Sequence, residues 1–260
     1  MTIQIDRPVP GVLRLLIDRP EKRNAINHEV RQALIEALII AREQTDCRAI
    51  VLGGVGEVFS AGGDIASMVD LDEDGARERM RHIHQLCCLI EQTPVPVISA
   101  VEGICAGAGV GLALLGDIII AGTTSKFMFP FMRLGLTPDW GSLRTLPARV
   151  GVAAAKRMLI SDQVICGEEA VRIGLADEFV VCGVMATAVN RAAKMACLPQ
   201  DAFARMKRRL ADPAASFAEE LQKEEDDQAV LLLAEDFQEG YAAFNEKRIP
   251  AFITSSRKYS

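Results

Sequence analysis

The sequence has few aromatic side chains and no excess of positive charge. The first excludes a mainly aromatic core, and the second excludes a general attraction for polyanions. Aromatic residues make up 5% of the 260 residues, so the core is built mainly from aliphatic side chains. Lys and Arg total 29 against 35 Asp and Glu, which gives a formal net charge of -6. This charge provides no general attraction for nucleic acid or an anionic membrane. We therefore expect neither as a partner, and any anionic ligand must be held by local basic residues.

Cysteine and histidine patterns of metal sites are also missing. The seven cysteines are odd in number, scattered, mostly set in apolar segments, and none forms a CxxC pair. His28, His82 and His84 do not cluster with them, and His82 and His84, two positions apart, face different ways on a helix. We expect reduced, buried thiols in a cytoplasmic protein and no metal site.

Targeting and membrane segments are lacking as well. The N-terminus MTIQIDRPVPG has no basic region followed by an apolar one, as a signal peptide would. The longest uncharged stretch near the middle, residues 103–116, is too short to span a bilayer. These features predict a soluble, cytoplasmic protein.

What is present is an alternation of short apolar runs with amphipathic ones. Strands are predicted at 2–6, 11–17, 48–52, 97–101, 118–121 and 127–131. Helices are predicted after the capping residue Asn27 and at 76–92, 107–115, 184–196, 201–210, 214–229 and 230–247. The alternation indicates an α/β core with buried parallel strands over residues 1–195. Residues 196–260 are expected to form a helical C-terminal oligomerisation region, an arm that packs on the core or on a neighbouring subunit.

Two glycine-containing segments follow predicted strands. In EVFSAGGDI the glycines expose backbone N–H groups, and in GICAGAGVGLAL a helix begins at Gly107, Ala108 and Gly109. The free N–H groups and positive dipole end of that helix suit a developing anion. A glycine-rich turn and close helix packing are the structural alternatives. The glycine spacing excludes a dinucleotide fingerprint, and a P-loop is excluded because G-K-[ST] is absent.

These segments together resemble a known family. RPEKRNAIN, VFSAGGDIASM, GICAGAGVGLALLGDIIIA, FMRLGLTPDWGSLRTLP and EGYAAFNEKRIPAF, in this order, resemble the crotonase (enoyl-CoA hydratase/isomerase) family along essentially the whole chain. The resemblance implies a crotonase-like spiral of ββα units and a homotrimer or dimer of trimers. It implies an acyl-CoA thioester as substrate, with coenzyme A part of the substrate and no separate cofactor.

Residue roles follow from the resemblance. Gly63 and Ala108 match the positions whose backbone N–H groups hold the thioester oxygen. The remaining matches are to residues around coenzyme A: Lys22, Arg23 and Ala25 in one loop, Ala61, Asp64 and Ile65 in another, and Phe244 and Lys247 in the C-terminal helix, commonly reaching the site of a neighbouring subunit.

The hydratases of the family carry two glutamates, one on each side of the substrate double bond, and this sequence departs from them at both positions. Gly111 and Phe131 stand there, and neither moves a proton. The remaining carboxylate, Asp139, lies in a P-D-x-G pattern that resembles 1,2-epoxyphenylacetyl-CoA isomerase-like members. With Phe131, Met132 and Trp140 expected to line an apolar acyl pocket, Asp139 would be partly desolvated and a stronger base.

We therefore expect an isomerase that shifts a double bond through an enolate, with Asp139 as the base. Three alternatives stay open. Asp139 could activate water in a hydratase or hydrolase, the chain could be a non-catalytic acyl-CoA-binding protein, or Asp139 could only cap the next helix.

Overall fold

The computed structural model describes residues 2–252, and a six-stranded sheet forms its centre. The strand order is β1 (Ile3–Val9), β2 (Val12–Ile17), β3 (Ala49–Gly54), β4 (Val97–Val101), β6 (Ile118–Gly122) and β9 (Glu178–Val180). β1 and β2 form an antiparallel hairpin, whereas the other neighbours are parallel. Because the parallel strands are buried, they are nearly continuous aliphatic runs.

A second, three-stranded sheet has the order β5 (Ile104–Ala106), β7 (Lys126–Met128) and β8 (Ile165–Cys166). β5 follows β4 closely and β7 follows β6, so each of these strand pairs contributes one strand to each sheet. The helices that follow complete a repeated ββα arrangement. The expected α/β class is confirmed.

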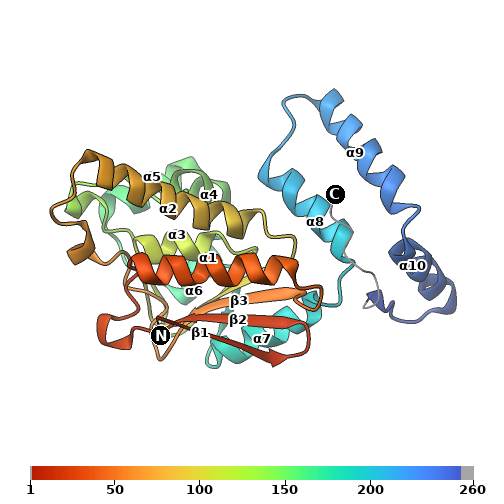
Figure 1. The fold of residues 1–260 in the computed structure, drawn as a ribbon, viewed down its shortest axis with the longest axis horizontal. Helices are drawn as coiled ribbons and strands as arrows, with labels where there is room; N and C mark the ends of the chain where they lie inside the picture. Colours follow the sequence, from red (N-terminus) through yellow and green to blue (C-terminus); the bar gives the residue numbers. More distant parts are fainter. Residues whose placement is uncertain (1, 253–260) are drawn as a thin grey trace.

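The helices form layers on both faces of the large sheet (Figure 1). They are α1 (His28–Glu43), α2 (Glu73–Glu91), α3 (Ala108–Leu114), α4 (Ser142–Val150), α5 (Val152–Ser161), α6 (Gly167–Arg172) and α7 (Val184–Met195). α7 packs Val184, Ala188 and Ala192 on one face of the sheet. The opposite face buries the larger core, to which α1, α2 and α3 contribute.

Beyond α7 the chain forms an arm of three helices, α8 (Gln200–Ala211), α9 (Phe217–Leu231) and α10 (Glu235–Glu246). Lys207 of α8 joins the arm to the core, because its buried Nζ donates to Asp117 Oδ2 at 2.8 Å. α9 and α10 lie away from the sheet (Figure 1). Their exposed apolar side chains include Phe217, Leu233 and Phe244.

Several boundaries differ from the predicted ones. The strand predicted over 127–131 ends at Met128, because Pro130 has no N–H to pair and Phe131 begins a turn. α2 begins at Glu73 rather than 76, because Asp72 Oδ1 accepts from Gly75 N at 2.8 Å and caps it. The helix predicted from 230 starts at Glu235, since α9 continues to Leu231.

The thiols form no disulfide within residues 2–252, but the expectation that they are buried is mostly wrong. Cys47 and Cys105 are buried, whereas four are exposed: Cys88, Cys166, Cys182 and Cys197. No helix of the described residues has both the length and the apolar character needed to cross a bilayer.

Candidate active site

Three loops meet beside the carboxyl ends of the parallel strands, and backbone hydrogen bonds hold them together. The loop after β2 binds the loop after β3, since Ala61 N donates to Arg23 O at 2.9 Å and Asp64 N to Ile26 O at 3.0 Å. The loop after β3 in turn binds β5, where Ala106 N donates to Ser60 O at 3.0 Å. The fold thus brings the two glycine-containing segments next to each other.

A buried asparagine shapes the first of these loops. Asn24 is fully buried in a left-handed conformation, with φ of 56°, and its Nδ2 donates to Val55 O at 3.0 Å and Val58 O at 2.6 Å. Asparagine tolerates this backbone region better than most residues. Ser60 Oγ donates to Asn24 O at 2.7 Å, which joins the loops further.

The backbone N–H of Gly63 points away from Ile26, the residue with which Gly63 is paired. In the parallel bridge between Gly63 and Ile26, the hydrogen bonds are made by the residues on either side of Gly63. Ile26 N donates to Gly62 O at 2.7 Å, and Asp64 N donates to Ile26 O. The N–H of the intervening residue of such a bridge points to the opposite side. No acceptor for Gly63 N–H is found within residues 2–252.

Ala108 is the first residue of α3, so its N–H has no acceptor inside the helix. The two segments approach closely because glycines face each other's backbone. A Cβ on Gly62 would lie 2.8 Å from Ala106 O and 3.6 Å from Ala108 N, and one on Gly109 would lie 2.7 Å from Ser60 O. The glycines at these positions let the two segments that carry these N–H groups pack closely together.

Asp139 does not cap the helix that follows it. The cap of α4 is Gly141, with no side-chain hydrogen bond, and Asp139 contributes only its backbone oxygen, which accepts from Ser142 N at 3.0 Å. Asp139 Oδ1 and Ser142 Oγ are buried and without hydrogen-bond partners among residues 2–252. Buried polar atoms are normally satisfied, so an unpartnered carboxylate oxygen makes Asp139 a candidate functional residue.

The surroundings of Asp139 make it a stronger base than an exposed aspartate. Burial raises the pKa of Asp139 above its ordinary value, and a hydrogen bond from its own backbone, followed by the charges of Arg79 and His84 on α2, offsets part of this rise. His82, by contrast, faces α1, so the two histidines point different ways as predicted. Arg79 and His84 were missed in the sequence, where they appear only as part of a polar helix.

Trp140 fills the space beside Gly111, the position that the resemblance aligns with the first glutamate of the hydratases. It is 1% exposed and left-handed, with φ of 55°, an unusual conformation for a bulky residue. A Cβ on Gly111 would lie 2.4 Å from Trp140 Cβ. Phe131 is also buried, whereas Met132 is half-exposed. The acyl-pocket role of these three residues stays a prediction.

The residues predicted around coenzyme A divide between two places. Lys22, Arg23 and Ile65 are exposed on the loops beside Gly63, and Ala25 and Ala61 are half-buried there. The carboxylate of Asp64 accepts from Arg19 Nη1 at 3.0 Å in a half-buried ion pair, so it braces the loop.

Phe244 and Lys247 lie at the end of α10, and Phe244 is 80% exposed. α10 lies at the opposite end of the molecule from the loop between β2 and α1 (Figure 1). Within one chain these residues are therefore not brought to the site.

Comparison with known proteins agrees with this architecture. The family described as Enoyl-CoA hydratase/isomerase matches residues 9–255. A probable enoyl-CoA hydratase of Rhodobacter capsulatus is 38% identical over 254 residues, covering 93% of this chain and 94% of the relative. The 1,2-epoxyphenylacetyl-CoA isomerase of Escherichia coli is 32% identical over 249 residues, covering 93% and 95%. The crystal structure of an enoyl-CoA hydratase from Bacillus anthracis superposes with a TM-score of 0.92 at 27% identity, covering 98% of this chain and all of that one.

The chain therefore belongs to the enoyl-CoA hydratase/isomerase family, the crotonases, and has their fold. It is an enzyme of this family with an acyl-CoA substrate.

Proposed function

We propose that the protein is an enoyl-CoA isomerase that moves a double bond along its acyl-CoA substrate, with Asp139 as the single acid–base group. The observation that carries this proposal is the buried, unpartnered Oδ1 of Asp139, which is not used to cap α4. Relatives named as hydratases and as an isomerase both occur, so the family alone leaves the choice open.

The choice of isomerisation rests on what stands at the two glutamate positions. Gly111 has no side chain, and Trp140 fills the space beside it. Phe131 is buried and carries no proton. Hydration by a pair of carboxylates needs one to activate water and another to protonate carbon. One carboxylate suits a proton shuttle, because the same group can remove a proton from one carbon and, once protonated, deliver one to another.

The mechanism requires two N–H donors and one base. The thioester oxygen accepts from Gly63 N–H and Ala108 N–H. Asp139 takes a proton from a carbon of the acyl chain, and the electrons of that C–H bond form an enolate whose charge the donors stabilise. The protonated Asp139 then returns the proton two carbons away. Each such donor typically contributes about 3 kcal/mol to the transition state, and the scheme calls on no metal or redox cofactor.

A hydratase that activates water with Asp139 is the second candidate, favoured by the name of the Rhodobacter capsulatus relative. In that case Asp139 takes a proton from water and the enolate carbon is protonated from another source. Addition of water to crotonyl-CoA separates the two candidates.

We also propose a cytoplasmic homotrimer, or dimer of trimers, in which Phe244 and Lys247 complete the coenzyme A site of a neighbouring copy. Support comes from their exposure at the far end of the arm and from the apolar side chains exposed on α9 and α10. Sedimentation velocity tests the assembly. A monomer with full activity would overturn this part of the proposal.

The test of the catalytic proposal measures deuterium exchange and double-bond migration on 2- and 3-enoyl-CoA thioesters. It compares wild type, Asp139→Asn and the control Asp212→Asn, an exposed position between α8 and α9. We expect exchange and migration in wild type and control, and neither in Asp139→Asn, with thioester binding retained. Equal rates in all three proteins would remove Asp139 from catalysis. No turnover in any, with binding retained, would favour an acyl-CoA-binding protein.

A further inference from the structure

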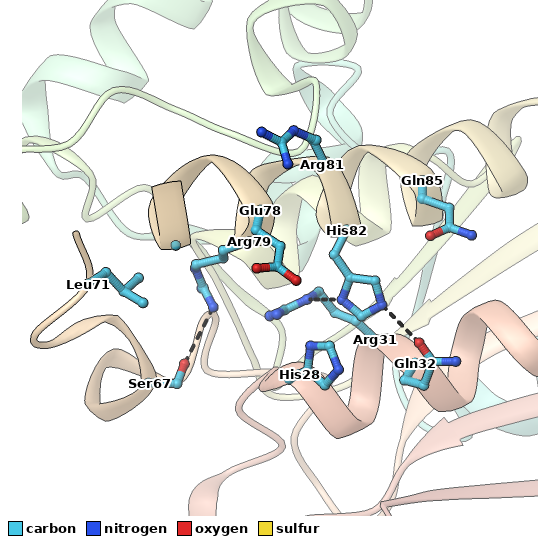
Figure 2. A pocket seen from close by; sticks show the side chains of 11 residues that line it. His28, Arg31, Gln32, Ser67, Leu71, Glu78, Arg79, Arg81, His82 and Gln85 are labelled. Carbon is cyan, nitrogen blue, oxygen red and sulfur yellow. Dashed lines mark hydrogen bonds between the residues drawn. The ribbon is translucent and has the colours of Figure 1, made fainter. Parts of the chain in front are cut away.

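A cavity of about 630 Å³ lies between the N-terminal half of α2 and the start of α1. Its size is typical of small-ligand sites. Its lining is polar and rich in cations, unlike the aliphatic core (Figure 2). The side chains come from two helices and the loop that precedes α2: His28, Arg31, Gln32, Ser67, Leu71, Glu78, Arg79, Arg81, His82 and Gln85.

Arg31 is the most unusual of these side chains, because it is only 2% exposed. Its Nε donates to His82 Nδ1 at 3.2 Å, and its Nη1 is buried without a hydrogen-bond partner among residues 2–252. His82 Nε2 lies 3.1 Å from Gln32 Oε1, and the ring stacks on His28 at 4.4 Å between centroids. Since Nδ1 accepts the hydrogen bond from Arg31, this imidazole is neutral and adds no charge beside the arginine.

Arg79 adds a second guanidinium to the cavity. The side chain of Arg31 extends toward Arg79 in Figure 2, where Arg79 also reaches the hydroxyl of Ser67. Burial, together with the charge of Arg79, lowers the pKa of Arg31 to about 10, which leaves both arginines charged at neutral pH.

Carboxylates act on this pair only from a distance. Glu29 on α1 acts on Arg31, and Asp139 and Asp64 act on Arg79, but no ion pair of either arginine is found within residues 2–252. A buried arginine with an unused donor and no ion-paired carboxylate is unfavourable by itself. The arrangement is what a site for an anion requires before its ligand arrives.

The cavity adjoins the catalytic loops through Arg79. A Cβ on Gly63 would lie 3.4 Å from Arg79 Nη2. The guanidinium is therefore next to the residue whose N–H is proposed to bind the thioester oxygen. Arg79 also interacts electrostatically with Asp139 and Asp64. Arg79 is thus the residue through which a group at the end of the acyl chain would meet the cavity.

We propose that this cavity is a carboxylate-binding subsite and that the acyl group of the substrate ends in a carboxylate. The inference rests on the proposed function, because the oxyanion role of Gly63 is what places the acyl chain at the cavity. A carboxylate matches the fork of a guanidinium and carries a single charge. The phosphate groups of coenzyme A, which together carry more negative charge, fit less well because Glu78 shares the lining, and Lys22 and Arg23 on the exposed loop suit them better.

The experiment compares the binding of saturated thioesters by calorimetry, so that it does not depend on turnover. Adipyl-CoA is measured against hexanoyl-CoA, which has the same chain length without the carboxylate, and against free coenzyme A. The variants are Arg31→Met and Arg79→Met. The controls, Arg42→Met and Arg77→Met, alter exposed arginines of the same two helices outside the cavity. Two variants are used because Arg31→Met changes a buried position.

We expect wild type and controls to bind adipyl-CoA at least about tenfold more tightly than hexanoyl-CoA, because charge-assisted hydrogen bonds discriminate strongly. Both cavity variants should lose that preference. Equal binding of the two thioesters by wild type would overturn the inference. So would variants that weaken free coenzyme A as much as adipyl-CoA, since the anion would then be a phosphate.

The outcomes also separate this inference from the proposed function. Preferential binding of adipyl-CoA without isomerisation of any enoyl thioester would retain the subsite and reject the isomerase. Isomerisation of neutral enoyl thioesters, with no preference for the carboxylate, would retain the isomerase and reject the subsite.

Discussion

The Cβ of Trp140 lies 2.4 Å from the point at which a Cβ on Gly111 would stand. The two residues are therefore matched: glycine leaves the space and the tryptophan fills it. In hydratases of the family, a glutamate projects from the position of Gly111. In this chain a side chain at position 111 would collide with Trp140, so we expect that Gly111→Glu alone does not create a hydratase site.

This relationship predicts that Gly111→Ala destabilises the protein. A Cβ closer than 3.0 Å to another requires the backbone to shift, and overpacking of this kind typically costs about 1–3 kcal/mol. The control is Gly240→Ala on α10, where the nearest atoms would be 3.7 Å away and alanine favours the helix. Urea unfolding of both variants measures the effect. Equal stability of Gly111→Ala and wild type would contradict the close packing.

Asp139 should reduce stability at neutral pH. Burial raises its pKa in the folded state, so the neutral carboxyl is favoured by the fold, and the stability it contributes is lost as the pH rises through the raised pKa. Asp139→Asn removes this loss, and we expect the variant to be more stable than wild type at pH 7 by about 1 kcal/mol.

Urea unfolding of both proteins between neutral and acidic pH measures the difference, which should shrink as Asp139 becomes protonated. Asp212→Asn should show no such trend, since Asp212 is exposed. A variant less stable than wild type at pH 7 would mean that Asp139 makes stabilising interactions in the fold.

The activity should also depend on the ionisation of Asp139, but it requires the charged carboxylate, whereas stability is favoured by the neutral form. Asp139 must be ionised to accept a proton, so kcat/KM on a neutral enoyl-CoA should fall about tenfold per pH unit below the raised pKa. Because Arg79 lowers the pKa of Asp139, Arg79→Met should move this acidic limb to higher pH, while Arg77→Met should not. Superimposable profiles for all three proteins would assign the limb to another group.

Much of the fold could be predicted from the sequence because its signals are local. The caps at Asn27 and the runs that became β4 and β6 depend on residues that are neighbours along the chain. The glycine-containing segments were also recognisable, since bare N–H groups need glycine or a helix start nearby. Boundaries were missed where one residue ended or began an element, as Pro130 and Asp72 do.

The surroundings of Asp139 could not be predicted, because they form between distant segments. Proline before the aspartate and glycine after Trp140 gave the pattern of a helix cap, yet the left-handed conformation of Trp140 moves the start of α4 beyond the reach of the carboxylate. In the sequence, Arg31 and Arg79 resemble ordinary solvent-exposed residues of amphipathic helices. Only their burial in the folded chain distinguishes them.

The oxyanion role of Ala108 leads to a test that alters one backbone donor. Proline is accepted at the first position of a helix, where its missing N–H has no intrahelical partner. Ala108→Pro thus removes the proposed donor and fills its place while α3 can still form. We expect kcat/KM to fall at least about 100-fold, as for other oxyanion-hole donors, with a small change in melting temperature. The control is Val152→Pro at the first position of α5, an exposed site distant in sequence from the loops. Full activity in Ala108→Pro would exclude this N–H as a donor, and the enolate would then need a different partner for its charge.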